Sequence, residues 1–229
     1  LQREVPVVVT YHGSDINSRC IRPLSRLAMR RAAYNIFVSE SLIRPDFKIQ
    51  KSKFRILPCG VDLDKFSPIQ REEARAQLGL LPQGRYVLFS GAFSNGVKNA
   101  PLAQAACDLL PEAALLELHN RSREEVALVM NAADVLLVTS RHEGSPQVVK
   151  EALACNLPVV STNVGDIATM LSTTQGGTIA NPTPQDLAAA MEPFLNTPQR
   201  THARERMDIY SITHIASQLC SISNTIHHE

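Results

Sequence analysis

Short apolar runs alternate with stretches of helical periodicity along most of the chain. From about residue 85 onward, strand and helix patterns follow each other repeatedly, which predicts a doubly wound parallel sheet. Such a sheet binds ligands beyond the carboxyl ends of its strands. The predicted strands are residues 5–11, 35–39, 54–57, 86–91, 114–119, 135–139, 158–161 and 177–180. The predicted helices are residues 72–80, 101–110, 123–133, 167–171 and 184–196, with a helical stretch at 200–226.

One strand–helix–strand unit in the second half of the chain has the strongest pattern. An apolar strand at residues 135–138 leads into a glycine-bearing turn and a helix, and a strand at 158–161 follows. The stripe of the helix consists of Val148, Val149, Ala152 and Leu153. The order predicts a right-handed β-α-β unit. Ser145 suits the N-cap of its helix and Pro146 the first helical position.

The start of this helix has the chemistry of an anion site. Unpaired N–H groups and the positive end of the helix dipole favour a bound anion. Pro146 has no N–H, so the expected donors are Ser145, Gln147 and Val148. Gly144 would let the anion approach the backbone closely.

Two carboxylates flank this turn. Glu143 lies in the turn, and Glu151 lies about one and a half turns inside the helix. A carboxylate suits adjacent sugar hydroxyls, because its two oxygens accept two hydrogen bonds. One carboxylate could therefore meet one end of an extended ligand while the other meets the opposite end.

The segment from Glu143 to Glu151 has the sequence Glu-Gly-Ser-Pro-Gln-Val-Val-Lys-Glu. It continues as Ala-Leu-Ala-Cys-Asn-Leu-Pro-Val-Val, and the tripeptide Asn-Val-Gly follows at residues 163–165. It strongly resembles the retaining nucleotide-sugar glycosyltransferases of family 4, which have the GT-B fold. The resemblance implies an enzyme that moves a hexose from a nucleoside-diphosphate sugar to an acceptor with retained anomeric configuration. It assigns Glu151 to the ribose hydroxyls and Glu143 to the sugar ring.

A second segment, after the strand at 86–91, resembles the phosphate-contacting part of this family. Ala92 stands where family members usually carry Arg, and Lys98 stands in the place of the family's Lys. Lys98 would neutralise the leaving diphosphate; alternatively it is a surface lysine. The expected catalytic residues are Glu143, Lys98 and His12. The expected donor-binding residues are Glu151, Gly144, Ser145, Pro146, Gln147, Gly91, Ala92, His119, Arg121 and Gly165, with His119 to Arg121 bordering the nucleobase.

The first part of the chain is similar to the last part of a family 4 N-terminal domain. The resemblance places His12 at the end of an inner strand, facing the cleft and the acceptor, although a histidine in such a turn is often structural. The family's Gly-rich loop is missing and residue 1 is Leu. We therefore expect an incomplete Rossmann-like domain at 1–62, a linker at 63–84, the nucleotide-sugar domain at 85–199, and a cross-over helix at 200–229.

Composition narrows the function classes. A hydrophobic content of 44% and a charged content of 20% are typical of a globular protein, and the sequence has no apolar run of membrane-spanning length and no signal peptide. Five cysteines are scattered without metal-ligand spacing, which favours reduced thiols and a cytoplasmic location. The absence of Trp and the 5% aromatic content disfavour a platform for single-stranded nucleic acid.

Charge is unevenly distributed. Residues 1–60 hold 11 Lys/Arg and 4 Asp/Glu, a net charge of +7, whereas the rest of the chain carries −6. Much of the positive charge lies on one helix that carries Arg22, Arg26 and Arg30. This helix could contact an anionic acceptor or the cytoplasmic membrane surface, or it could be a solvated face. No nucleic-acid motif accompanies the charge.

Several interpretations of the whole chain stay open. No Asp-x-Asp-like pair lies near the expected site, and the family needs no metal, so we expect no metal cofactor. Besides an enzyme, the chain could be a truncated nucleotide-sugar-binding module, weakly active or inactive. A sugar-nucleotide epimerase of the same fold is disfavoured by the Glu143/Glu151 framework. A dehydrogenase is disfavoured because no Gly-x-Gly-x-x-Gly fingerprint follows a strand.

Overall fold

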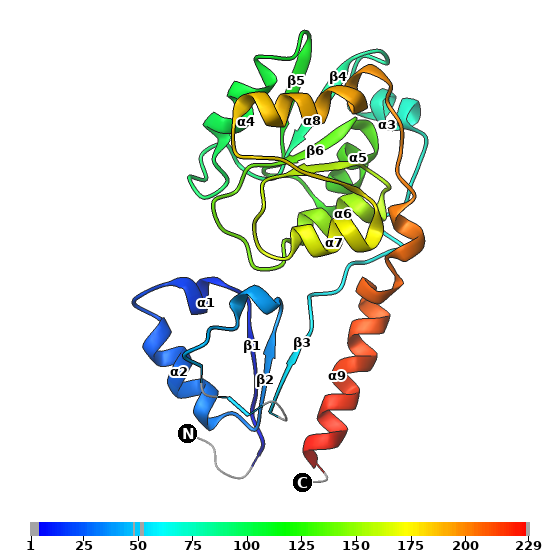
Figure 1. Ribbon diagram of the computed structural model, residues 1–229. Helices are drawn as coiled ribbons and strands as arrows, with labels where there is room; N and C mark the ends of the chain where they lie inside the picture. The colour runs from blue at the N-terminus through cyan, green and yellow to red at the C-terminus, as the bar shows by residue number, and fades with distance from the viewer. Residues whose placement is uncertain (1–4, 48, 51–52, 228–229) are drawn as a thin grey trace.

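The computed structural model describes residues 5–47, 49–50 and 53–227 and contains two parallel sheets. The smaller sheet has the order β1-β2-β3, and the larger has the order β5-β4-β6-β7-β8 (Figure 1). The strands are β1 (Val8–Tyr11), β2 (Tyr34–Phe37), β3 (Phe54–Ile56), β4 (Arg85–Phe89), β5 (Ala113–Glu117), β6 (Val135–Val138), β7 (Val159–Ser161) and β8 (Gly177–Ile179). The alternation of strands and helices confirms the expected α/β class.

Helices connect and cover these strands. The α-helices are α1 (Ser14–Asn17), α2 (Arg22–Arg31), α3 (Arg71–Leu78), α4 (Ala100–Cys107), α5 (Arg123–Ala132), α6 (Gln147–Ala154), α7 (Ile167–Thr174), α8 (Pro184–Asn196) and α9 (Ile212–His227). The short 3-10 helices are η1 (Glu40–Leu42), η3 (Ala203–Arg206) and η4 (Asp208–Tyr210). We expected a helical stretch over residues 200–226, but the structure has two short 3-10 helices, η3 and η4, before α9 begins.

The central strand β6 explains why the larger sheet has two apolar faces. Leu136 and Val138 pack into the cluster that includes α5, α6 and α7, whereas Val135 and Leu137 pack into the cluster that includes α4 and α8. All four side chains are buried, and burying each one fully stabilises the fold by roughly 1.5–3 kcal/mol. A continuous apolar run is what a strand covered by helices on both faces requires.

The smaller sheet differs from the expectation at β1. This strand lies at the edge of the described sheet and β2 is central, so β1 is not an inner strand among the described residues. The residues around its start, Val5, Val7 and Val8, are exposed rather than buried, because no described element covers them. Tyr11 and Phe37, in contrast, stack in a buried aromatic cluster.

The chain crosses between the two sheets twice, and the two crossings run side by side. Val61 N–H donates to the Tyr210 carbonyl at 2.8 Å, and Ile212 N–H donates to the Val61 carbonyl at 3.0 Å. A Cβ at Gly60 would lie 2.8 Å from Ile212 Cα, so glycine permits this close approach. After the second crossing, α9 runs beside the smaller sheet (Figure 1), and its Ile215 packs in a buried cluster with Ile36 and Leu57.

Candidate active site

Two of the three expected catalytic side chains meet at the carboxyl edge of the larger sheet. Lys98 Nζ lies 2.8 Å from Glu143 Oε1, and the two side chains are only 19% and 14% exposed. A Cβ at Gly91 would lie 3.1 Å from Lys98 Cγ, so this glycine leaves room for the lysine stem. Thr139 Oγ1 donates to the Lys98 carbonyl at 2.8 Å and fixes the loop after β4 against the end of β6.

The start of α6 differs from the expectation in one respect. The helix begins at Gln147, and Pro146 is the N-cap, with an extended ψ of 121° and no side-chain cap. Ser145 therefore precedes the cap and is not the N-cap itself, since the residue before a proline is pushed out of the helical region. The side chain of Gln147 is also engaged, because its Nε2 donates to the Gly60 carbonyl at 2.9 Å.

Gly144 has a different neighbour from the one we expected. A Cβ at this position would lie 2.7 Å from the His12 carbonyl oxygen, and the Leu42 side chain lies 3.7 Å away. A Cβ at Gly165 would lie 2.5 Å from the Gly144 carbonyl oxygen. The two glycines thus allow three turns to pack together, and the space beside the Gly144 Cα holds the turn after β1.

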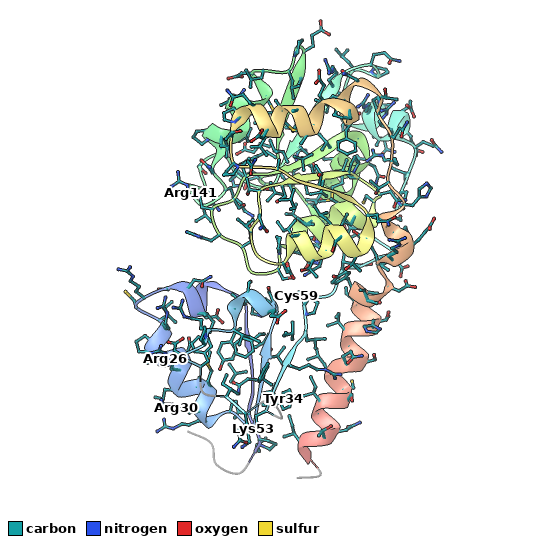
Figure 2. All side chains as sticks on the ribbon, in the orientation of Figure 1. Arg26, Arg30, Tyr34, Lys53, Cys59 and Arg141 are labelled. Carbon is teal, nitrogen blue, oxygen red and sulfur yellow. The ribbon has the colours of Figure 1, made fainter. Side chains whose placement is uncertain are left out.

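His12 reaches the same region through that turn. The Asp15 carboxylate accepts hydrogen bonds from the N–H groups of His12 at 3.1 Å and Gly13 at 2.8 Å, which holds the turn in shape. The imidazole is exposed, and its Nδ1 lies 3.6 Å from Cys59 Sγ. Cys59 lies at the junction of the two sheets (Figure 2). The structure therefore brings the turn of His12 against the turn of Glu143, which pairs with Lys98, at the junction between the two sheets.

Glu151 lies deeper and is paired with a residue that sequence reasoning missed. Arg123 Nη1 lies 2.6 Å from Glu151 Oε1, and the Glu151 side chain is 5% exposed. Burial raises the pKa of Glu151, and Arg123 opposes that rise. Arg123 starts α5, whose capping box joins Ser122 and Glu125. The Ser-x-x-Glu pattern is visible in the sequence and marks this helix start, but it does not reveal the partner of Arg123.

A second missed residue is Lys150. Its side chain is fully buried, and Nζ lies 3.5 Å from the Ser145 carbonyl oxygen, beneath the turn before α6. Burial lowers the pKa of Lys150, and nearby Asp166 opposes this. Burial likewise raises the pKa of Asp166. Lysine is rarely fully buried, so its charge would predict a solvent-facing side chain at this position of the helix. The sequence alone therefore gave no sign that Lys150 is buried.

The remaining expected residues surround the loops after β4 and β5. Phe93 N–H donates to Glu117 Oε1 at 2.5 Å, which places the loop containing Ala92 beside the end of β5. His119 and Arg121 follow that edge strand and are exposed, and Arg121 Nε donates to the Glu117 carbonyl at 3.5 Å. They lie at the same carboxyl edge but have no described contact with Glu143 or Glu151.

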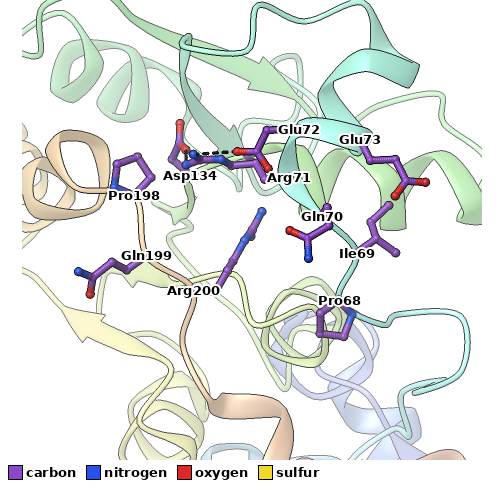
Figure 3. A pocket seen from close by; sticks show the side chains of 11 residues that line it. Pro68, Ile69, Gln70, Arg71, Glu72, Glu73, Asp134, Pro198, Gln199 and Arg200 are labelled. Atoms are coloured by element: carbon purple, nitrogen blue, oxygen red, sulfur yellow. Dashed lines mark hydrogen bonds and ion pairs between the residues drawn. The ribbon is translucent and has the colours of Figure 1, made fainter.

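A cavity of about 600 Å³ lies elsewhere, near the start of β6 (Figure 3). One arginine of its lining, Arg71, pairs with the buried Asp134 at 3.1 Å, and Arg75, outside the lining, pairs with the same carboxylate at 2.8 Å. Arg75 and Arg200 also donate to the last carbonyls of α5, those of Met130, Asn131 and Ala132. The cavity lies at the amino end of the sheet and is not the candidate active site.

Two absences concern only the described part of the chain. No group of three or more His, Cys, Asp or Glu side chains there could hold a metal ion. No helix among those residues is both long and apolar enough to cross a membrane.

Two family models match the chain. Glycosyl transferases group 1 matches residues 95–213, and Glycosyltransferase Family 4 matches residues 1–65. The chain belongs to the family 4 glycosyltransferases, and its architecture is a partial GT-B fold.

Named relatives agree with this family. TuaC of Bacillus subtilis (strain 168), a glycosyltransferase named for teichuronic acid biosynthesis, is 29% identical over 212 residues, which are 82% of this chain and 54% of TuaC. D-inositol 3-phosphate glycosyltransferase of Mycobacterium leprae (strain Br4923) is 32% identical over 145 residues, 51% of this chain and 34% of the relative. The chain thus spans about half the length of TuaC and less of the second relative.

Solved structures show the same fold. Sucrose-phosphate synthase from Thermosynechococcus elongatus superposes with a TM-score of 0.84 at 23% identity, covering 96% of this chain and 68% of that one. HepE of Anabaena, solved with UDP, superposes with a TM-score of 0.79 at 19% identity, covering 96% and 72%. At these identities the likeness supports the fold alone.

Proposed function

We propose that this chain carries the donor site of a glycosyltransferase that moves a hexose from a nucleoside-diphosphate sugar to an acceptor hydroxyl, with retention of anomeric configuration. The observation that carries the proposal is the Lys98–Glu143 pair, which lies at 2.8 Å beside the start of α6 at the carboxyl edge of the sheet. This edge is where ligands of doubly wound sheets bind.

The transfer breaks the bond between the anomeric carbon and a diphosphate oxygen. A bond from the acceptor oxygen to that carbon forms, and the proton of the acceptor hydroxyl passes to the departing diphosphate oxygen. Negative charge grows on the departing diphosphate, so cations and N–H groups placed there in advance lower the barrier. The ammonium of Lys98 has three N–H donors, so it can keep its hydrogen bond to Glu143 and still donate to the diphosphate. The first N–H groups of α6 would add the positive end of its dipole.

The two carboxylates would hold the rest of the donor. Glu143, in the turn before α6, would accept hydrogen bonds from sugar ring hydroxyls, while Glu151, within α6, would accept them from the ribose. Both side chains are largely shielded from solvent, which strengthens charged hydrogen bonds. His12, at the turn packed on Gly144, would face the acceptor, which we expect to be a carbohydrate or a lipid-linked sugar.

HepE of Anabaena, which was solved with UDP and with UDP-glucose, supports a uridine nucleotide as the first donor to test. We propose further that turnover needs no metal, because Lys98 and the start of α6 supply positive charge at the diphosphate. Turnover should then persist in EDTA, and loss of activity that Mg²⁺ restores would overturn this part of the proposal.

We also propose that the protein works in the cytoplasm and touches the inner membrane surface through α2. This helix exposes the basic side chains of Arg30 (Figure 2) and Arg31, and its apolar Leu24 is 68% exposed. A basic helix with exposed leucines suits an anionic bilayer surface. Other arginines on the helix have intramolecular partners, such as Arg26 with Asp46.

A second candidate function is a nucleotide-sugar-binding module without turnover. One observation favours it: Lys98, Glu143 and Glu151 all belong to the part of the chain that forms the larger sheet. Calorimetry with UDP, GDP and ADP and their hexose conjugates, followed by a test for released nucleoside diphosphate, separates the two. Binding with release supports the enzyme, binding alone supports the module, and no binding to any of these donors would contradict both.

Matched variants sharpen this experiment. Glu143→Gln should weaken binding of the sugar nucleotide more than binding of the nucleoside diphosphate, because Glu143 is assigned to the sugar. Glu192→Gln, an exposed glutamate on α8, serves as the control. Equal losses for both ligands would contradict the sugar-ring role.

A further inference from the structure

Arg123 holds the carboxylate assigned to the ribose, although nothing in the sequence pattern marks it as a donor-site residue. Its Nη1 lies 2.6 Å from Glu151 Oε1. The guanidinium carbon lies 4.9 Å from the centre of the Phe66 ring, which is fully buried. The Arg123 side chain is 52% exposed, yet its head group is held between a carboxylate and an aromatic face.

The pairing leaves part of Glu151 available. Within the described residues, no group donates a hydrogen bond to Glu151 Oε2, whereas Oε1 has Arg123. An ionised carboxylate oxygen accepts up to two hydrogen bonds, so Oε2 could accept from a ribose hydroxyl while Arg123 keeps Oε1 in place.

We propose that Arg123 is a positioning and specificity-determining residue of the donor site, which orients the Glu151 carboxylate and thereby selects nucleotides with an intact ribose diol. The inference rests on the proposed function. Arg123 acts through Glu151, and it belongs to a different element, since it starts α5 while Glu151 lies in α6.

The charged groups around Glu151 determine how the loss of Arg123 should change the pKa of the Glu151 carboxyl. Burial raises the pKa of Glu151, and Arg123 on α5 and Lys150 on α6 oppose the rise. The Cys155 thiol also lies near, but burial raises its pKa to about 12, so it is neutral at ordinary pH. Without Arg123 the Glu151 carboxyl should protonate at higher pH. A protonated carboxyl loses acceptor capacity. As the pH is lowered, the variant should therefore lose ribose binding at a higher pH than the wild type does.

The test compares Arg123→Gln, Arg123→Lys and the control Arg206→Gln, an exposed arginine that donates to the Thr173 carbonyl. Calorimetry would measure the Kd of uridine diphosphate and of 2′-deoxyuridine diphosphate from pH 5 to pH 8. Arg123→Gln should weaken uridine diphosphate binding about tenfold while changing the deoxy compound little, since a charged hydrogen bond is of that size. Arg123→Lys should restore part of the discrimination, and the control should match the wild type.

Two further measurements decide each remaining outcome. Glu151→Gln tests the proposed function: if it keeps wild-type preference for the ribo compound, the ribose role of Glu151 fails. If Glu151→Gln loses that preference but Arg123→Gln keeps both the preference and the pH profile, only the Arg123 inference fails. Should uridine diphosphate not bind at all, NMR titration of the glutamate carboxyls still decides whether Arg123→Gln raises the pKa of Glu151. An unshifted carboxyl would overturn the inference.

Discussion

Replacing Lys98 with Met is the most direct perturbation of the proposed site. Methionine keeps an unbranched apolar stem that can lie over Gly91, but it removes the ammonium 2.8 Å from Glu143. Exposed ion pairs contribute about 0–1 kcal/mol, and breaking a buried pair costs about 3–5 kcal/mol. With exposures of 19% and 14%, this pair lies between these limits, so we expect a stability loss of about 1–2 kcal/mol.

The effect on function should be larger than the effect on stability. If Lys98 stabilises the departing diphosphate, its loss removes one preorganised electrostatic donor. Such a loss lowers turnover by about 10² to 10³-fold, equivalent to about 2.7–4 kcal/mol of transition-state stabilisation. Binding of uridine diphosphate should weaken by about tenfold, because a charged hydrogen bond to phosphate is lost.

The assay combines thermal unfolding, calorimetry with uridine diphosphate, and release of nucleoside diphosphate from the sugar nucleotide. Lys53→Met, at an exposed lysine directly before β3 (Figure 2), is the matched control and should behave as the wild type. The double variant Lys98→Met/Glu143→Gln separates two roles of the lysine. If Lys98 only neutralises Glu143, the double variant should recover the affinity for uridine diphosphate. Recovery to the wild-type value would refute the diphosphate role.

Three other predictions concern the crossings, α2 and the thiols. Gly60→Ala should lower the free energy of unfolding by about 1–3 kcal/mol in denaturant titration, because the new Cβ would lie 2.8 Å from Ile212 Cα; an unchanged midpoint would contradict the close packing of the crossings. Leu24→Ser should reduce co-flotation with anionic but not zwitterionic vesicles, and equal flotation of both proteins would argue against a membrane role for α2. Cys107 and Cys155 should resist a thiol-specific reagent at pH 8 until the protein unfolds, because burial raises the pKa of each to about 12, and rapid labelling of all five thiols would show otherwise.

The larger sheet was predictable because its short apolar runs alternate with segments of helical periodicity, a pattern typical of parallel α/β sheets. Residues 135–138 form a four-residue apolar run between helical patterns, and the structure buries it on both faces. Strand and helix ends were less predictable. Pro146 was expected inside α6 but caps it, because its φ suits both positions and only its ψ of 121° decides between them.

The contacts of the candidate site were predictable only in part. The spacing of Glu143 and Glu151 identified both carboxylates, and the structure places Lys98 on one of them. The partner of the other was not predictable, because Arg123 starts α5 and pairs with Glu151 in α6, which lies 28 residues later in the sequence. A sequence shows which residues can form ion pairs, but distant pairs depend on how the helices pack.

The packing of Gly144 against the turn after β1 links the two sheets to the proposed chemistry. The His12 carbonyl oxygen occupies space that any side chain at 144 would fill, so the glycine serves contact between the two parts of the chain. The turn that contains Gly144 also carries Glu143, which pairs with Lys98, and its Ser145 carbonyl accepts a hydrogen bond from the buried Lys150. A shift of the smaller sheet would therefore move the turn that carries Glu143. We infer that donor binding and the position of the N-terminal turn depend on each other, because both use the backbone of residues 143–145.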